Sequence, residues 1–111
     1  MTDSLFGVHG AALQVRSARM GAIASNIANA ATPGYKARDL DFGAAMQSVE
    51  AGGGFESAVR YRTPLQPALD GNTVELATEQ TAFAENAVAY RATLGFLNGR
   101  INTLTRALKG E

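Results

Sequence analysis

The side chains that could do chemistry are few and poorly placed for it. His9 is the only histidine, so the chain lacks both the second imidazole of a zinc pair and the HExxH spacing of a zinc protease. We expect His9 to be a surface or packing residue. The absence of cysteine excludes thiolate zinc sites, thiol catalysis and disulfides. No serine is flanked as in a nucleophile elbow.

Two further groups of residues only partly match reactive motifs. The glycines at 52–54 lack the Lys-Ser/Thr pair of a phosphate-binding loop, so a flexible linker is the better interpretation. Asp39 and Asp41 are carboxylates two residues apart, but Lys36 and Arg38 stand beside them. We interpret this group as a solvated or intersubunit charge cluster, not as an acid/base pair. The sequence therefore predicts no catalytic residue, no metal ligand and no cofactor, and the protein is not expected to be an enzyme.

Length and composition limit the number of domains and the classes of partner that the protein can have. The chain has 111 residues, about one small domain, and its formal net charge of zero argues against a nucleic-acid binder. No segment is long and apolar enough to span a bilayer. The start is not a secretory signal, because Asp3 is the first charge and no apolar run follows a basic start. Any export would need another route.

The most regular pattern lies in the last third and predicts a helix over 73–108. Apolar residues recur there at alternating gaps of four and three, the heptad pattern of a helix that packs along another helix. This expected helix seam and subunit interface consists of Phe83, Ala87, Tyr90, Leu94, Leu97, Ile101, Leu104 and Leu108. Asn72 and Glu75 together resemble a capping box, which places the helix start between Asn72 and Ala77.

A first helix is predicted over 4–30, with Asp3 or Ser4 as its N-cap. Pro33 and Gly34 should end it, because proline disfavours the α region at the preceding residue and glycine permits a turn. Its seam residues recur every seven positions and are Phe6, Leu13, Met20 and Ile27. The fold that satisfies both stripes is mainly α: two long terminal helices pairing as an antiparallel coiled-coil-like hairpin.

A connector and small middle segment over 31–72 separates the two helices. Asp41 is placed to cap a short helix over 42–50. The prolines within 55–69 favour extended chain or an edge strand. We expect residues 1–111 to form a single domain with a short irregular, partly extended middle.

The reverse face of the last helix carries a second stripe of small and apolar residues. This expected second packing face consists of Val88, Ala92, Gly95 and Gly99. Charges are few along the helix, and small residues let another backbone approach closely. The pattern indicates helices packed on several sides, as in a polymer or multi-subunit bundle, so that the isolated monomer is only partly folded. A weak, partly frayed hairpin with alanine-rich faces is the alternative.

The end of the first helix resembles the N-terminal motif of bacterial flagellar rod and hook proteins, an SNIANxxTPGYK-like run. The matching residues are Ser25, Asn26, Ile27, Ala28, Asn29, Thr32, Pro33, Gly34, Tyr35 and Lys36. Within that group, residues 37–42 and 66–76 resemble the proximal rod protein family FlgB. The resemblance covers both terminal helices and the connectors.

The resemblance implies a structural subunit of the basal-body proximal rod. Such subunits polymerise helically with copies of themselves and other axial proteins into a drive shaft around the export channel. It also implies export by the flagellar type III system without a cleaved signal peptide, a place in the periplasmic rod, and the adaptor FliE and the export gate as partners. The alternatives are another rod or hook subunit, or a small helical adaptor or chaperone that binds a partner helix beside Leu94 and Leu97.

The motif also permits predictions from its chemistry. Asn26 and Asn29 lie where helix carbonyls lack partners, so they are expected to bond the backbone locally or to bond a neighbouring subunit. The turn that follows is expected to be an intersubunit docking edge, formed by Tyr35, Lys36, Arg38, Asp39 and Asp41.

Overall fold

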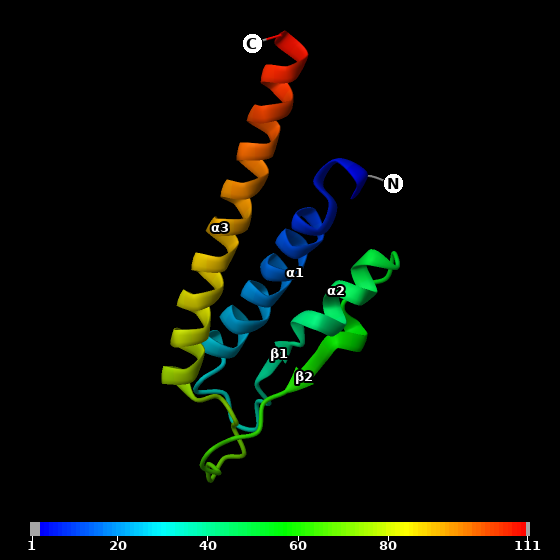
Figure 1. Cartoon of the computed structure of the whole chain (residues 1–111). Helices are drawn as coiled ribbons and strands as arrows, with labels where there is room; N and C mark the ends of the chain where they lie inside the picture. The colour runs from blue at the N-terminus through cyan, green and yellow to red at the C-terminus, as the bar shows by residue number, and fades with distance from the viewer. Residues whose placement is uncertain (1–2, 111) are drawn as a thin grey trace.

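The protein is an antiparallel pair of long helices with a small α/β unit against one of them (Figure 1). The structure, a computed structural model, describes residues 3–110 and the side chains of residues 6–110. Helix α1 (Asp3–Ala28) runs toward one end of the molecule and α3 (Leu76–Lys109) returns alongside it. The molecule measures 65 × 26 × 18 Å. The predicted hairpin of terminal helices is confirmed.

Glycines mark both ends of α1. The helix ends at Ala28, two residues before the predicted end, and the chain turns at Gly34 with a φ of +74°. Near its start α1 is kinked at Gly7, whose φ of 56° and ψ of −139° suit glycine but few other residues. The kink, which the sequence pattern did not predict, turns the first residues away from α3 (Figure 1). The predicted N-cap at Asp3 or Ser4 falls outside the described side chains.

The middle of the chain is more regular than the sequence predicts. Strand β1 (Arg38–Leu40) pairs antiparallel with β2 (Val59–Tyr61), with Leu40 opposite Val59. Strand β2 confirms the extended chain expected within 55–69, whereas β1 lies in the expected connector. The 3-10 helix η1 (Glu56–Ala58) precedes β2.

Helix α2 (Phe42–Glu50) has the predicted bounds and the predicted cap. Asp41 Oδ1 accepts a hydrogen bond from the Ala44 amide at 3.2 Å. This bond satisfies one of the amides that a helix N-terminus leaves without an intrahelical partner.

The main hydrophobic cluster lies between α1 and the middle segment. Val15 of α1 packs there with Leu40, Ala45 and Ala58, which are all buried. Alanine at these positions keeps side chains short, so α2 can approach α1 closely. The first helix is therefore covered on one side by α3 and on another by β1 and α2.

The face of α3 that packs on α1 is not the predicted stripe. The residues buried along α3 are Glu79, Ala82, Asn86, Thr93 and Leu97, and only Leu97 belongs to that stripe. Phe83, Leu94 and Ile101 remain 38%, 39% and 41% exposed. A heptad pattern is found from apolar residues alone. It therefore predicted contact through the apolar stripe, whereas α3 packs on α1 through the adjacent face, which includes buried polar side chains.

The predicted stripe of α1 is corrected in the same way. Its members stay only half-buried, and the buried residues of α1 are Ala12, Val15, Ile23 and Asn26.

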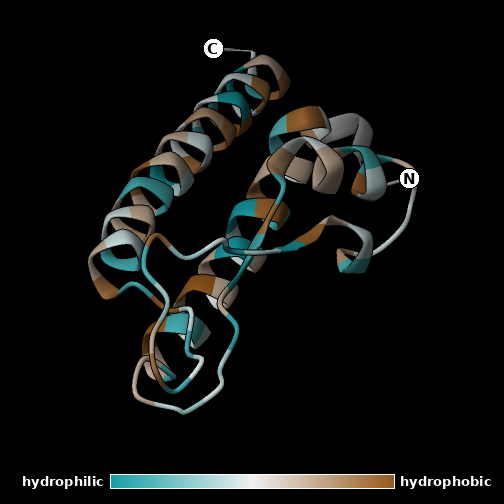
Figure 2. Ribbon diagram, turned by 90° about the horizontal axis from the view of Figure 1, so that it is seen from below, coloured by the Kyte–Doolittle hydropathy of each residue, from teal (hydrophilic) through white to brown (hydrophobic). Residues whose placement is uncertain are grey.

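The last part of α3 has no cover from the other residues that the structure describes. Residues 98–110, which we call the overhang, are all exposed, and they extend past the start of α1 (Figure 1). Figure 2 shows hydrophobic residues recurring along α3 toward its C-terminal end. Leu104 is 41% exposed and Leu108 88% exposed. The molecule thus carries apolar surface that its own fold leaves in water.

Candidate subunit interface

The motif residue Asn26 joins three elements at the closed end of the helix pair. Its side chain is fully buried. Its Nδ2 donates to the Arg38 carbonyl at 2.7 Å and to Glu79 Oε1 at 3.0 Å, while its Oδ1 accepts from the Arg38 amide at 3.0 Å. The predicted local bonding is wrong for Asn26, because its partners are distant in sequence. It holds β1 and α3 onto α1 within one chain.

The second asparagine of the motif behaves as a local cap. Asn29 Nδ2 donates to the Ser25 carbonyl at 2.8 Å, and its Oδ1 accepts from Thr32 Oγ1 at 3.0 Å. The hydroxyls of Ser25 and Tyr35 share a hydrogen bond of 2.9 Å. Local bonding, one of the two predictions for Asn29, is confirmed.

The Asn72 side chain caps the C-terminal end of α1 and does not cap the N-terminus of α3. Its Nδ2 donates to the carbonyls of Asn29, Ala30 and Thr32 at 3.0, 3.1 and 2.7 Å, and its Oδ1 accepts from the Val74 amide. The predicted capping box is wrong, because the N-cap of α3 is Glu75 and makes no side-chain capping bond. A helix C-terminus leaves carbonyls unpaired, and here a residue far along the chain satisfies them.

Replacing Asn72 with alanine should lower the free energy of unfolding by about 1–3 kcal/mol, because carbonyls near the end of α1 lose their donor. Urea denaturation followed by far-UV circular dichroism measures this change. Asn98→Ala is the matched control, since Asn98 is exposed on the overhang. Equal stability of the two variants would show that solvent replaces the Asn72 bonds without cost.

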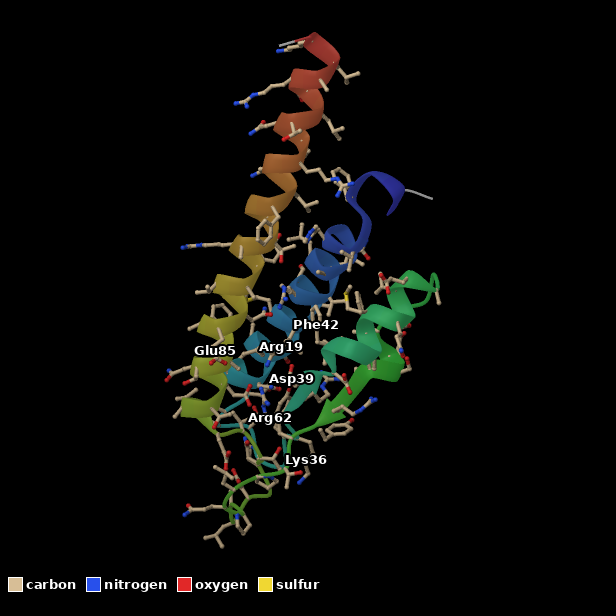
Figure 3. All side chains as sticks on the ribbon, viewed as in Figure 1. Arg19, Lys36, Asp39, Phe42, Arg62 and Glu85 are labelled. Carbon is tan, nitrogen blue, oxygen red and sulfur yellow. The ribbon has the colours of Figure 1, made fainter. Side chains whose placement is uncertain are left out.

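Two arginines and two carboxylates alternate beside Asn26. Arg19 donates to both oxygens of Asp39 at 2.8 and 3.0 Å, and Arg62 Nη2 lies 3.3 Å from Asp39 Oδ2. Arg62 also donates to both oxygens of Glu79, which is fully buried. Figure 3 shows Arg19, Asp39 and Arg62 close together between the helices and the sheet. We call these four residues and Asn26 the polar clasp.

The polar clasp corrects the interpretation of Asp39. Its carboxylate bonds two arginines of its own chain and is mostly buried, so it is not a solvated group. The four charges balance, which makes their burial tolerable. Sequence spacing could not reveal the clasp, because its members are far apart along the chain.

Acid should weaken the fold through Asp39. Burial raises the pKa of Asp39, but the hydrogen bond from Arg19, the Leu40 amide and the charges of Arg19 and Arg62 together hold it below its usual value. Because the pKa of Asp39 is lower in the folded state, its ionised carboxylate stabilises the fold at pH values above its unfolded pKa of about 4. This stabilisation is lost as the pH falls through the folded pKa.

Urea denaturation at a series of pH values between about 6 and 3 should therefore show the free energy of unfolding falling as the pH is lowered. The fall should be smaller for Asp39→Asn. Glu50→Gln, at an exposed position where the carboxylate forms no ion pair within the described residues, is the carboxylate control. An identical acid slope in Asp39→Asn and in the unsubstituted protein would rule out this role.

The turn expected to dock a neighbour is held mainly by its own chain. Lys36 Nζ donates to the Gly71 carbonyl at 2.7 Å. Asp41 caps α2 and lies 4.0 Å from Arg60. These bonds fix the direction in which the chain leaves α1. Docking of this edge on another subunit stays a prediction.

The second packing face has no cover within the described part of the chain. Val88 and the adjacent Phe96 are 68% and 62% exposed. A Cβ built on Gly95 or Gly99 would meet no atom within 4 Å. The His9 ring of α1 lies 5.5 Å from the Phe96 ring between centroids, so His9 packs against α3, one of the two roles expected of it.

The two predicted stripes face each other across an open groove. Phe6 and Leu13 of α1 and Tyr90 and Leu97 of α3 line a groove of about 680 Å³, and Phe55 from the middle segment also contributes. The fold therefore brings these apolar side chains near one another, and of the four stripe residues only Leu97 is buried.

In the described part of the chain, no group of three or more His, Cys, Asp or Glu residues is placed to hold a metal ion. None of its helices is both long and apolar enough to cross a bilayer.

A helix pair fixed at one end by buried polar bonds, with apolar surface left open along its length, defines a helical structural subunit of an assembly. Residues 6–36 match the family model described as flagella basal body rod protein. The chain is 48% identical over 120 residues to the flagellar basal body rod protein FlgB of Cereibacter sphaeroides, covering 95% of this chain and 94% of that protein.

Two further relatives carry the same name. FlgB of Aeromonas hydrophila is 42% identical over 126 residues, covering 98% of this chain and 96% of the relative. FlgB of Escherichia coli K12 is 36% identical over 121 residues, covering 88% of each. The chain therefore belongs to the FlgB family of flagellar basal body rod proteins. The resemblance found in the sequence is confirmed, and the helical adaptor is not favoured.

Proposed function

We propose that the chain serves as a structural subunit of the proximal flagellar rod and polymerises through the apolar faces of its two long helices. The observation that carries this proposal is the exposed apolar surface of α3, which continues onto the uncovered overhang. Contiguous apolar surface of this kind marks protein interaction sites in soluble proteins.

The interface on this proposal uses both faces of α3. The predicted seam residues supply one apolar stripe, and the second packing face supplies another with glycines that admit a close neighbour. Contacts between unlike surfaces of identical subunits give open helical arrays when the rotation does not close, as a rod requires. This role needs no chemistry from side chains.

The finer parts of the proposal rest on the family resemblance. The partners at the base of the rod are the adaptor FliE and the export gate, and the partners beside it are other rod proteins and further copies of this chain. The chain leaves the cytoplasm through the flagellar type III system without a cleaved signal peptide and takes its place in the periplasmic rod.

The test is electron microscopy of basal bodies from cells that lack this chain, scored together with swimming. Rods should be absent and swimming lost, and a plasmid copy should restore both. Complete rods and normal swimming in the deletion strain would overturn the proposal.

Gly95→Leu tests the second packing face. The helix should not weaken, because glycine in a helix interior costs about 1 kcal/mol relative to alanine and the new side chain points into open space. Rod assembly should fail, because the added side chain keeps the neighbouring helix away.

The measurements are a thermal melt of the monomer and the swimming of the complemented deletion strain. Thr78→Leu, at an exposed position of α3 away from both stripes, is the control. Normal swimming with Gly95→Leu would show that this face is open to solvent in the rod.

A further inference from the structure

The groove between α1 and α3 continues across α1. Phe6, Gly10 and Gln14 line the groove described above and also a second hollow of about 540 Å³ on the side of α2, which Val49 and Glu50 border. The N-terminal half of α1 thus forms the floor of a wide apolar depression. The volume of each of the two hollows lies in the range of roughly 300–1,000 Å³ found for ligand pockets, which are lined mostly by apolar side chains.

The overhang has an apolar face that could pack against this depression. Ile101, Leu104 and Leu108 are spaced three and four residues apart, so they lie on one side of the helix. The overhang cannot fold back into the groove of its own molecule, because α3 continues without a break past Leu97 and extends beyond the start of α1 (Figure 1).

We propose that the overhang of one subunit seats in the groove of a second copy of this chain. The inference rests on the proposed role in the rod, and it names the two surfaces that meet. The side chains of Ile101, Leu104 and Leu108 enter the depression between Phe6, Leu13, Tyr90 and Leu97.

The charges around the two surfaces are complementary. The overhang carries Arg100, Arg106 and Lys109 and no acidic residue. Glu50 borders the depression and Glu56 follows the lining residue Phe55, and neither carboxylate forms an ion pair within the residues that the structure describes. The depression also meets the C-terminus of α2, the negative end of that helix. A basic helix end is therefore drawn to this site, whereas an acidic segment is repelled.

The geometry makes the contact head-to-tail. Leu104 lies about 10 Å beyond Leu97 along α3, since each helical residue rises about 1.5 Å. A subunit that donates its overhang must therefore be displaced along the long axis relative to the subunit that receives it. Because the donating and receiving surfaces differ, each subunit offers one free overhang and one free groove, and the series stays open.

Engineered cysteines can test this contact cleanly, because the chain has none of its own. The variant Gln14→Cys/Leu104→Cys places one thiol at the groove and one on the apolar face of the overhang. The two positions are too far apart to bridge within one molecule, since a disulfide needs Cα atoms closer than about 7 Å. Gln14→Cys/Asn102→Cys is the matched control, with its second thiol on the opposite face of the overhang.

Each variant is expressed in the deletion strain, and basal bodies are oxidised and separated by non-reducing electrophoresis. The expected result is a ladder of linked multimers for the Leu104 pair and little linkage for the Asn102 pair. Swimming before oxidation tests the rod role separately. Rods and swimming without a ladder would overturn this inference while leaving the rod role intact, and a single dimer band would also overturn it.

A second variant does not depend on thiol chemistry. Leu104→Ala should weaken association of the purified full-length chain by roughly tenfold or more, because a buried leucine side chain is lost from the contact. Sedimentation across a concentration series measures this change. Thr103→Ala, on another face of the overhang, should change it little. Equal association of both variants would contradict the proposed seating.

Discussion

Replacing Glu79 with alanine should lower the free energy of unfolding by about 3–5 kcal/mol, a large part of the roughly 5–15 kcal/mol that stabilises an ordinary domain. Glu79 is fully buried and accepts from Asn26 and Arg62. Without it, the Arg62 charge keeps only Asp39 as a partner and Asn26 loses one acceptor. Urea denaturation near neutral pH, followed by far-UV circular dichroism, measures the loss.

Two variants sharpen this test. Gln80→Ala changes the next residue of α3, which is exposed, and should leave the midpoint nearly unchanged. Glu79→Gln keeps an oxygen for Asn26 but removes the negative charge opposite Arg62, so it should fall between the other two. A Glu79→Ala protein as stable as the Gln80→Ala protein would show that the polar clasp contributes no net stability.

Replacing Leu94 with aspartate should abolish rod assembly while leaving the monomer folded. Leu94 is 39% exposed, so the charge remains hydrated in the monomer, and the cost there is at most about 1 kcal/mol. In the rod, the same charge would lie in the apolar interface without a partner. Deletion cells carrying this variant should make no rods, although purified protein should melt close to the unsubstituted protein.

Leu97→Asp separates folding from assembly. Leu97 is only 6% exposed, so this change should destabilise the monomer itself by several kcal/mol. Both variants should stop swimming, but only Leu97→Asp should lower the melting temperature strongly. Normal rods with Leu94→Asp would remove the predicted stripe from the interface.

The sequence predicted helix starts and ends well where one side chain or one backbone preference determines them. Asp41 caps α2 at the expected place because the cap depends on a side chain and an amide three residues apart. Pro33 and Gly34 ended the first helix near the expected position, since both act on the backbone beside them. The motif over 25–36 also sufficed to assign the family, because those residues stand in one continuous run.

Tertiary structure decided which faces are buried and which bonds the motif makes. Asn26 and Asn72 find acceptors on segments distant in sequence, and no spacing rule connects them in advance. Glu79, Asn86 and Thr93 are buried only because α1 lies against them, so a count of apolar residues placed the seam on the adjacent stripe. The sequence alone thus determined the helices, their turns and the family, because these depend on local chemistry. The fold decided which apolar residues the chain buries and which it leaves for another subunit, because burial depends on the position of every element at once.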